Sequence, residues 1–345
     1  MEFTIIAGIF LTTIAGLLTG ICPWPLKFIR HFKYEHWGFF SMLTGFIVAP
    51  WIITLLFCPN TITALQSIGW LTLLKSNLFS LSWGIANILY LLCLVRIGVS
   101  LTYGIMTGIG VSMGVVIPMI FKGSGQFENA PDVFSASGFV VLTGVAIMIL
   151  GVIGVSVAGS LREKHLADSG KKDSKRFRVG LVMVILSGFL SAGISFSFVY
   201  GQGPIMEAMK AQGADDVAAN IAVWAIAISA GALINIIYPL ILMFRNKNWN
   251  IIAKHPLEIV WSFAFGLTLF TGFAVMGKGM LLLGALGASV GFGLQQIMQI
   301  LGGQSVGFLK GEWKGISGKA PKFMVVAISI LIIAAIIMAY GLQSR

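Results

Sequence analysis

Residues 83–123 form an almost uninterrupted apolar stretch, WGIANILYLLCLVRIGVSLTYGIMTGIGVSMGVVIPMIFKG. One helix needs about 20 apolar residues to cross the hydrocarbon core of a bilayer, so this stretch is long enough to cross it twice. Trp83, Asn87 and Tyr90 are spaced i, i+4, i+7 and therefore share one face of a helix. The stretch predicts two transmembrane helices, the first carrying groups that can stack and form hydrogen bonds.

The rest of the chain has the same character. Of its 345 residues, 57% are hydrophobic and 10% are charged, and the mean hydropathy of +0.93 exceeds that of soluble globular proteins. We therefore expect a polytopic membrane protein. The formal net charge of +11 does not indicate a nucleic-acid partner, because the basic residues fall in short loops where the positive-inside rule accounts for them.

Ten apolar stretches are long enough to cross a bilayer as helices. Their approximate ranges are Phe3–Ile21, Gly38–Phe57, Asn77–Val95, Val99–Phe121, Ser137–Ala158, Val179–Tyr200, Val217–Phe244, Ile259–Met276, Leu281–Phe308 and Phe323–Leu342. The N-terminal stretch lacks the basic region and cleavage site of a secretory signal, so we interpret it as a retained first span. The segment Thr61–Leu74 is too short to span and is expected to lie along the interface or to re-enter.

The order of the segments predicts two halves. Residues 1–160 would form a first five-helix repeat, residues 161–178 a charged cytoplasmic linker, and residues 179–345 a second five-helix repeat. The heptapeptide GVSLTYG at 98–104 returns as GASVGFG at 287–293, and Gly98, Gly104, Gly287 and Gly293 would allow close helix packing. The first and sixth spans also match in residue spacing: Gly8, Gly16, Leu18 and Thr19 correspond to Gly180, Gly188, Leu190 and Ser191.

The basic residues predict how the chain is oriented. Of the 23 lysines and arginines, 18 follow odd-numbered spans and so fall on one side of the membrane. By the positive-inside rule that side is cytoplasmic, which leaves both termini outside, in the periplasm of an inner-membrane protein. Because each half has an odd number of spans, the second half enters the membrane from the opposite side. The repeat is therefore expected to be inverted. Inverted repeats are a frequent plan of secondary transporters, although a duplicated bundle can also be a scaffold.

A transporter must replace the hydrogen bonds that its solute gives up with water, and uncharged donors and acceptors inside the bundle do this. An amide in an apolar span indicates substrate binding more specifically than a serine does. Serines in membrane helices more often bond to their own backbone or aid helix packing. Interhelical bonding is the competing explanation for each amide. The predicted substrate-binding residues are Trp83, Asn87, Tyr90, Tyr103, Ser191, Ser195, Trp224, Asn235, Gln295 and Gln299.

The twelve acidic residues all fall outside the deep parts of the expected spans. A cationic solute would need a buried carboxylate as its counter-ion, whereas a neutral, hydroxyl-rich solute suits amides and aromatic rings. The candidates for proton coupling are four carboxylates near span ends, for which a solvated loop charge is the alternative. They are Glu35, Glu207, Glu258 and Glu312.

No enzyme motif and no ATP-binding motif is present, so we expect neither an enzyme nor a cofactor. Cys22, Cys58 and Cys93 are scattered, which fits neither a disulfide framework nor a metal site. Transport energy would then come from a cation gradient, with a proton favoured over Na⁺, or from solute exchange.

Several segments taken together resemble the L-rhamnose/proton symporter family, a branch of the drug/metabolite transporter superfamily. Those segments are Pro25 and Lys27 followed by Glu35 and Trp37, then APWIITLLFCPN, WGIANILY with the following Gly98 and Ser100, FLSAGISF, MEAMKAQGADD and GEWKG. The resemblance covers most of the chain. It implies ten helices in inverted repeats and proton-coupled sugar import.

The ninth span departs from that family pattern, because it reads GASVGFGLQQIMQILGGQ where a more aromatic stretch with an acidic residue is expected. The leading interpretation is an importer of a monosaccharide, L-rhamnose or a related deoxy sugar, by proton symport with alternating access. The alternatives are an exporter or exchanger of another sugar or metabolite, and a membrane scaffold or sensor that moves no solute.

Overall fold

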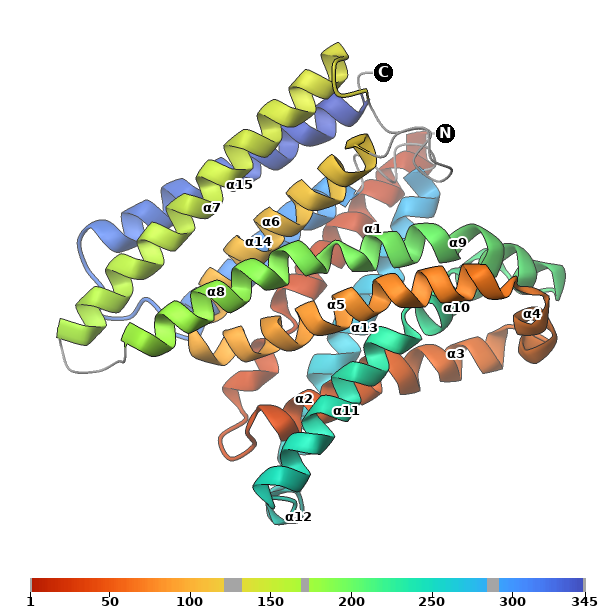
Figure 1. The fold of residues 1–345 in the computed structure, drawn as a ribbon, viewed down its shortest axis with the longest axis horizontal. Coiled ribbons are helices and arrows are strands. Elements are labelled where there is room, and N and C mark those ends of the chain that lie inside the picture. The colour runs from red at the N-terminus through yellow and green to blue at the C-terminus, as the bar shows by residue number, and fades with distance from the viewer. Residues whose placement is uncertain (1, 121–131, 169–173, 284–291, 344–345) are drawn as a thin grey trace. The chain divides into compact units, whose positions relative to one another are not determined.

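The structure is a computed structural model that describes residues 2–120, 132–168, 174–283 and 292–343. Every regular element in these ranges is helical (Figure 1). The long elements are α1 (Glu2–Ile21), α5 (Trp70–Arg96), α6 (Val99–Ile120), α7 (Ala136–Asp168), α8 (Ser174–Ser191), α9 (Gly193–Ala211), α11 (Ser229–Asn246), α13 (Pro256–Leu283), α14 (Phe292–Leu309) and α15 (Lys319–Gln343). The shorter ones are η1 (Trp24–Lys27), α2 (Tyr34–Leu43), η2 (Thr44–Val48), α3 (Ala49–Phe57), α4 (Thr61–Ser67), α10 (Asp216–Ala227) and α12 (Asn250–Lys254).

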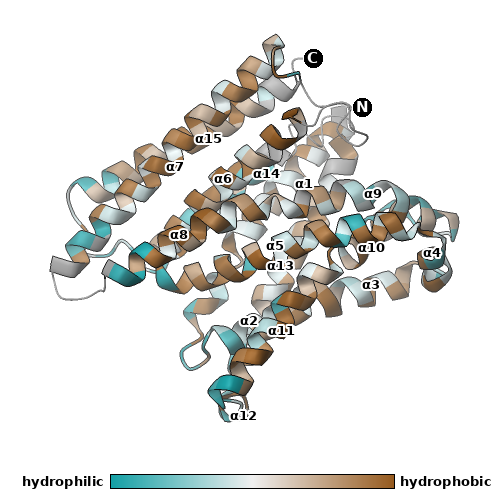
Figure 2. Cartoon of the chain, in the orientation of Figure 1, coloured by the Kyte–Doolittle hydropathy of each residue, from teal (hydrophilic) through white to brown (hydrophobic). Residues whose placement is uncertain are grey.

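Among the described residues, eight helical segments are long and apolar enough to cross a membrane. Two shorter apolar helices, Val99–Met113 and Asp216–Ala227, coincide with parts of the fourth and seventh expected spans. Hydrophobic residues run along α7 and α15, and hydrophilic residues gather at helix ends and at α12 (Figure 2). The chain is therefore a multi-pass helical membrane protein.

Several expected boundaries differ from the helices. The sixth span, expected as one helix over Val179–Tyr200, is interrupted at Ala192, between α8 and α9. The seventh span, expected as one helix over Val217–Phe244, is interrupted at Ile228, which has φ −102° and ψ 7°. The third span begins at Trp70 rather than at Asn77, which leaves α4 as the short helix before it. The fifth helix continues to Asp168 and so includes the first part of the expected linker. Apolar periodicity could not reveal the interruption at Ile228, because the residues on both sides of it are apolar. The end of α7 was missed for another reason: the helix continues into the charged residues 161–168, whose composition is typical of a loop.

The contacts divide the chain into two compact units. The first unit contains Met1–Ile21, Leu92–Ala192 and Gly279–Arg345, and the second contains Cys22–Leu91 and Gly193–Lys278. Each unit takes segments from both expected halves of the sequence. Residues 287–291, in the second copy of the heptapeptide, lie outside the described ranges.

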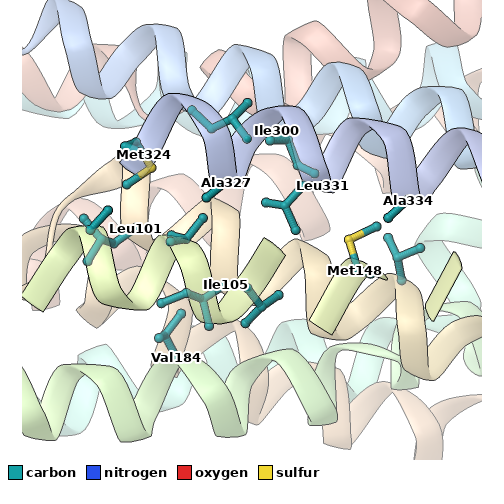
Figure 3. Packing of buried hydrophobic residues seen from close by; sticks show 14 of the residues in the cluster. Leu101, Ile105, Met148, Val184, Ile300, Met324, Ala327, Leu331 and Ala334 are labelled. Atoms are coloured by element: carbon teal, nitrogen blue, oxygen red, sulfur yellow. The ribbon is translucent and has the colours of Figure 1, made fainter. Parts of the chain in front are cut away.

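The first unit is held together by apolar helix packing. Its longest pairing is that of α7 with α15, which lie side by side (Figure 1). A Cβ at Gly151 would lie 2.6 Å from the side chain of Leu331, and one at Gly154 would lie 2.9 Å from that of Ala327. Small residues at a helix interface allow the backbones to approach, which is how helices gain packing energy in lipid. Side chains of α6, α7, α14 and α15 meet in this cluster (Figure 3).

The second unit combines long helices with all of the shorter elements named above. Asp215 begins α10 by accepting hydrogen bonds from the N–H groups of Val217 and Ala218 at 2.7 and 2.9 Å, which supplies partners for donors that a helix start leaves unpaired. Six alanines in and just before α10 belong to a buried apolar cluster that also includes Ile205 and Met209 of α9. Their small side chains let α10 pack closely on its neighbours.

Candidate functional site

The break between α10 and α11 lies inside the second unit and frees backbone groups that a continuous helix would pair. Asn77 of α5 joins the two sides: its Nδ2 donates to the carbonyl oxygen of Ile226 at 3.2 Å, and its Oδ1 accepts from the N–H of Ala230 at 2.9 Å. The carbonyl oxygen of Ala227 accepts from Ser197 Oγ at 2.9 Å. Side chains of α5 and α9 therefore stabilise an interruption that would be costly in lipid.

A second backbone irregularity lies in the same unit. Residues Thr44–Val48 form η2, a π-helical turn between α2 and α3. Such turns occur frequently at functional sites, and discontinuous helices form the binding sites of many secondary transporters. Phe46 of η2 is 1% exposed, and Trp224 lies one turn before the break in α10–α11. Each irregular segment thus carries a buried aromatic ring.

Five aromatic rings form a continuous row through the second unit, from Phe198 to Trp224, Phe273, Phe46 and Trp83. The successive ring centroids lie 4.6, 5.0, 5.7 and 4.9 Å apart. Trp83 and Trp224 were predicted from the sequence. The three phenylalanines were missed, because an isolated phenylalanine in an apolar span gives no signal in a single sequence.

The amides of Asn87 and Asn235 pair with each other. Asn87 Nδ2 donates to Asn235 Oδ1 at 2.9 Å, and Asn235 Nδ2 donates to the carbonyl oxygens of Gly84 and Gly231 at 3.0 and 2.8 Å. Both residues are buried, as is Tyr90 further along α5. The structure therefore brings together these two predicted binding residues, and their hydrogen bonds join α5 to α11.

Other predicted binding residues meet inside the first unit, around Thr19 of α1. Tyr103 Oη donates to the carbonyl oxygen of Thr19 at 2.6 Å, and Gln295 Nε2 donates to Thr19 Oγ1 at 3.1 Å. Gln299 accepts from Gln295 Nε2 at 3.3 Å. Ser191 Oγ donates to the carbonyl oxygen of Gly188, the local bond that serines in membrane helices commonly make. Ser195 lies in α9, and its side chain is outside the described part of the chain.

Three of the four candidate carboxylates accept hydrogen bonds. Glu258 accepts from the backbone N–H groups of Arg30, His31 and Phe32 at 2.7–3.1 Å, and His31 Nδ1 lies 2.8 Å from Oε1. Glu35 Oε1 accepts from the amides of Asn246 and Asn248 at 2.9 and 2.7 Å. Both glutamates are buried near the start of a helix.

Glu312, in the first unit, accepts from the N–H groups of Val99 and Ser100 at 2.6 and 3.1 Å. The Nη1 atom of buried Arg162 lies 3.8 Å from its Oε2, and the Arg162 guanidinium lies over the ring of Trp313 at 5.3 Å. Gly98 precedes α6 at φ +93°, and a Cβ there would lie 2.6 Å from Glu312. The carboxylate therefore packs against the start of α6. Glu207, the fourth candidate, is exposed.

One cluster in the described ranges has the composition of a metal site. Ligand atoms of His31, His255 and Glu258 lie within 4.8 Å of one another. The two imidazole rings are stacked at 3.7 Å with an interplanar angle of 3°. A metal bound by an imidazole lies near the plane of that ring, and two parallel stacked planes cannot both contain one ion. This arrangement is that of stacked rings beside a carboxylate, and it does not form a ligand set without rearrangement.

Buried amides, aromatic rings and interrupted helices inside a multi-pass bundle are features typical of membrane transporters. The sequence profile of the family described as L-rhamnose-proton symport protein (RhaT) matches residues 1–344, and the chain belongs to this family. It is therefore a transporter and not an enzyme.

Curated relatives match over most or all of their length. The chain is 28% identical, over 93% of each sequence, to the L-rhamnose-proton symporter of Cronobacter sakazakii. It is 27% identical, over the full length of both sequences, to the L-rhamnose-proton symporters of Klebsiella pneumoniae subsp. pneumoniae and of Yersinia pestis. No solved structure matches the chain.

Proposed function

We propose that this protein imports L-rhamnose, or a closely related deoxy sugar, together with a proton. Membership of the symporter family over residues 1–344 is the observation that carries this proposal. The interior of the second unit supports it, because its amides and aromatic rings offer hydrogen bonds and apolar surface to a neutral solute. The protein would act in the inner membrane, with both termini in the periplasm and residues 161–178 in the cytoplasm.

The proposal includes ten transmembrane helices in two inverted repeats of five, residues 1–160 and 179–345. Paired contacts support it. In the first unit α1 packs on α14 as α8 packs on α6, and α6 packs on α7 as α14 packs on α15. When the first to fifth spans are matched in order to the sixth to tenth, the contact of α1 with α14 corresponds to that of α8 with α6. The contact of α6 with α7 then corresponds to that of α14 with α15.

The spacing shared by the first and sixth spans gives further support. A Cβ at Gly8 would lie 2.8 Å from Leu283, in the residues before α14, and one at Gly180 would lie 2.4 Å from Ile97, in the residues before α6. A Cβ at Gly16 would lie 2.3 Å from a backbone atom of α14, and one at Gly188 would lie 2.7 Å from Ile109 of α6. Glycines at matching positions of the first and sixth spans thus make close contacts with the matching helices, α14 and α6.

The second unit contains the same kind of pairing. Gly45 packs on the backbone of Gly266, and Gly84 packs on the backbone of Gly231. These contacts join the second span to the eighth and the third to the seventh, which are exchanged by the proposed repeat. Alternating access would use the two repeats as moving parts, with small residues at the contacts allowing them to slide or rock.

Glu258 is the first choice among the four carboxylates for the coupling proton. His31 Nδ1 lies 2.8 Å from its carboxylate, so a proton can pass between two titratable groups, and the ring of His255 stacks on that of His31. Glu207 is exposed. Glu312 is the competing candidate, because it lies beside Arg162.

Uptake of radiolabelled L-rhamnose into proteoliposomes tests the function. We expect an inward proton gradient to accelerate uptake and a Na⁺ gradient to leave it unchanged. Counterflow into vesicles preloaded with L-rhamnose separates transport from a scaffold or sensor, which cannot exchange label. Uptake of another sugar only would show that the cargo is wrong.

Glu258→Gln tests the coupling site. We expect the variant to retain counterflow and to lose the acceleration by a proton gradient, since exchange of sugar does not require net proton movement. Glu207→Gln is the matched control and should keep gradient-driven uptake. Acceleration preserved in Glu258→Gln would move the assignment to Glu312 or Glu35.

A further inference from the structure

Two polar side chains of α10, Asn220 and Trp224, lie one turn apart on the same face of the helix. They are 2% and 3% exposed. No described residue forms a hydrogen bond with Asn220 Oδ1, Asn220 Nδ2 or Trp224 Nε1. The large majority of buried side-chain polar atoms in proteins have a hydrogen-bond partner, and leaving one unpaired costs about 1–3 kcal/mol. Three such atoms on one helical face therefore need an explanation.

The surroundings of Asn220 show where its amide points. A Cβ at Gly277 of α13 would lie 1.9 Å from Asn220 Oδ1 and 3.2 Å from Nδ2. The end of the amide thus occupies the space that a side chain at position 277 would take. Glycine at this position lets the carboxamide reach α13 without giving it a hydrogen-bond partner.

The indole of Trp224 is held by its ring faces. It stacks on Phe198 with an interplanar angle of 26° and contacts Phe273 at 38°. These contacts fix the ring while its N–H group, on the ring edge, is left without a partner among the described residues. The row of aromatic rings then continues from Phe273 through Phe46 to Trp83.

Three other amides inside the second unit, those of Asn77, Asn87 and Asn235, already have hydrogen-bond partners. Asn77 holds the break between α10 and α11, and Asn87 and Asn235 bond to each other. Asn235 also donates to two backbone carbonyls. Five buried side-chain atoms of this unit lack a hydrogen-bond partner among the described residues, and three of them belong to Asn220 and Trp224. The other two are Tyr34 Oη and Asn248 Oδ1, in residues that adjoin Glu35 or bond to it.

We infer that Asn220 and Trp224 bind the transported solute directly, as the polar contacts that select a neutral polyhydroxy compound. A carboxamide offers one acceptor and two donors, which matches a hydroxyl group that donates and accepts. The indole N–H donates to a second oxygen of the solute, and the phenylalanine rings pack against its C–H and methyl groups. This inference rests on the proposed function and adds to it the residues that select the sugar.

The test compares Asn220→Leu with Asn87→Leu in the purified full-length protein. Without ligand, Asn220→Leu is expected to unfold at the same or a higher temperature than the wild type, because it removes a buried group that has no partner. Asn87→Leu is expected to unfold at a lower temperature, because it leaves Asn235 Oδ1 unpaired. A purely structural role for Asn220 would lower its unfolding temperature in the same way.

Binding and transport give the second readout. The thermal shift produced by L-rhamnose should be lost or strongly reduced in Asn220→Leu, and KM for uptake should rise about tenfold or more. Trp224→Phe keeps an aromatic ring between Phe198 and Phe273 and removes the N–H group, so KM should rise about three- to tenfold. Wild-type KM in both variants would overturn the inference.

The outcomes separate this inference from the proposed function. If the wild type takes up L-rhamnose and both variants do so with unchanged KM, the function holds and the site is wrong. If the wild type instead takes up L-fucose or L-lyxose and the variants weaken that uptake, the cargo is wrong and the site holds. If none of the three sugars binds or is taken up, both are overturned.

Discussion

The two compact units differ in how they use their helices. The first unit packs long helices through glycine contacts and an apolar cluster, as in the pairing of α7 with α15. The second unit contains the π-helical turn η2 and the break at Ile228, both accompanied by buried aromatic rings and polar groups. Irregular backbone at membrane depth is tolerated only where protein supplies the missing hydrogen bonds. In the proposed function, the first unit supports the fold and the second recognises the solute.

The largest stability effect is expected from Gly231→Ala in the second unit. A Cβ at this position would lie 2.1 Å from the carbonyl oxygen of Ser80, a backbone atom that cannot move independently of α5. Overpacking of this kind costs up to about 3 kcal/mol, so the variant should unfold well below the wild type in detergent. Gly203→Ala is the control, since no atom lies within 4 Å of the added carbon among the described residues. Equal unfolding temperatures for the two variants would show that α5 and α11 are not in close contact.

Leu331→Ala probes the apolar packing of the first unit. Leu331 is fully buried against Gly151, and its truncation should cost about 2 kcal/mol of the free energy of unfolding. KM for uptake should stay unchanged if this unit supplies only support. Ile333→Ala, at a position that is 52% exposed, should leave both quantities unchanged. A rise in KM for Leu331→Ala would contradict the division of roles.

Asn77→Leu tests how much the side chain of Asn77 stabilises the break between α10 and α11. It removes the partner of Ala230 N–H and that of the Ile226 carbonyl oxygen, and we expect a loss of about 1 kcal/mol in the free energy of unfolding. The maximal uptake rate should fall as well, since the break is no longer held. Asn77→Asp keeps the acceptor for Ala230 N–H and should recover part of the stability. Thermal unfolding and uptake of the same preparations provide the measurement.

The smallest effect concerns the reactivity of Cys58, which follows α3 and is 2% exposed. Burial raises the pKa of its thiol, and the negative charge of Asp215 adds to the effect. A raised pKa lowers the fraction of reactive thiolate at pH 8, so maleimide labelling should be slow and should increase only at higher pH. We expect Phe57→Cys, in a chain without other cysteines, to react much faster because Phe57 is 61% exposed. Equal rates would show that this end of the second unit is open.

Part of the candidate site could be predicted from the sequence. Tryptophan and amide residues in apolar spans are rare enough to be noticed, which is why Trp83, Asn87, Trp224 and Asn235 were predicted. Asn77 was missed because it fell at the expected start of the third span, and Asn220 because one amide near the start of a span resembles an ordinary loop residue. Nothing in a single sequence distinguishes an amide that holds a helix break from one that faces a solute.

The sequence by itself determined that the chain crosses a membrane many times as helices, because apolar length and charge placement depend only on local composition. It also carried the resemblance to the symporter family, to which the chain belongs. The tertiary structure decided where α10 and α11 separate, which side chains satisfy that break, and which amides already have partners. These features depend on contacts between residues up to about 150 positions apart in the chain, and hydropathy contains no information about such contacts.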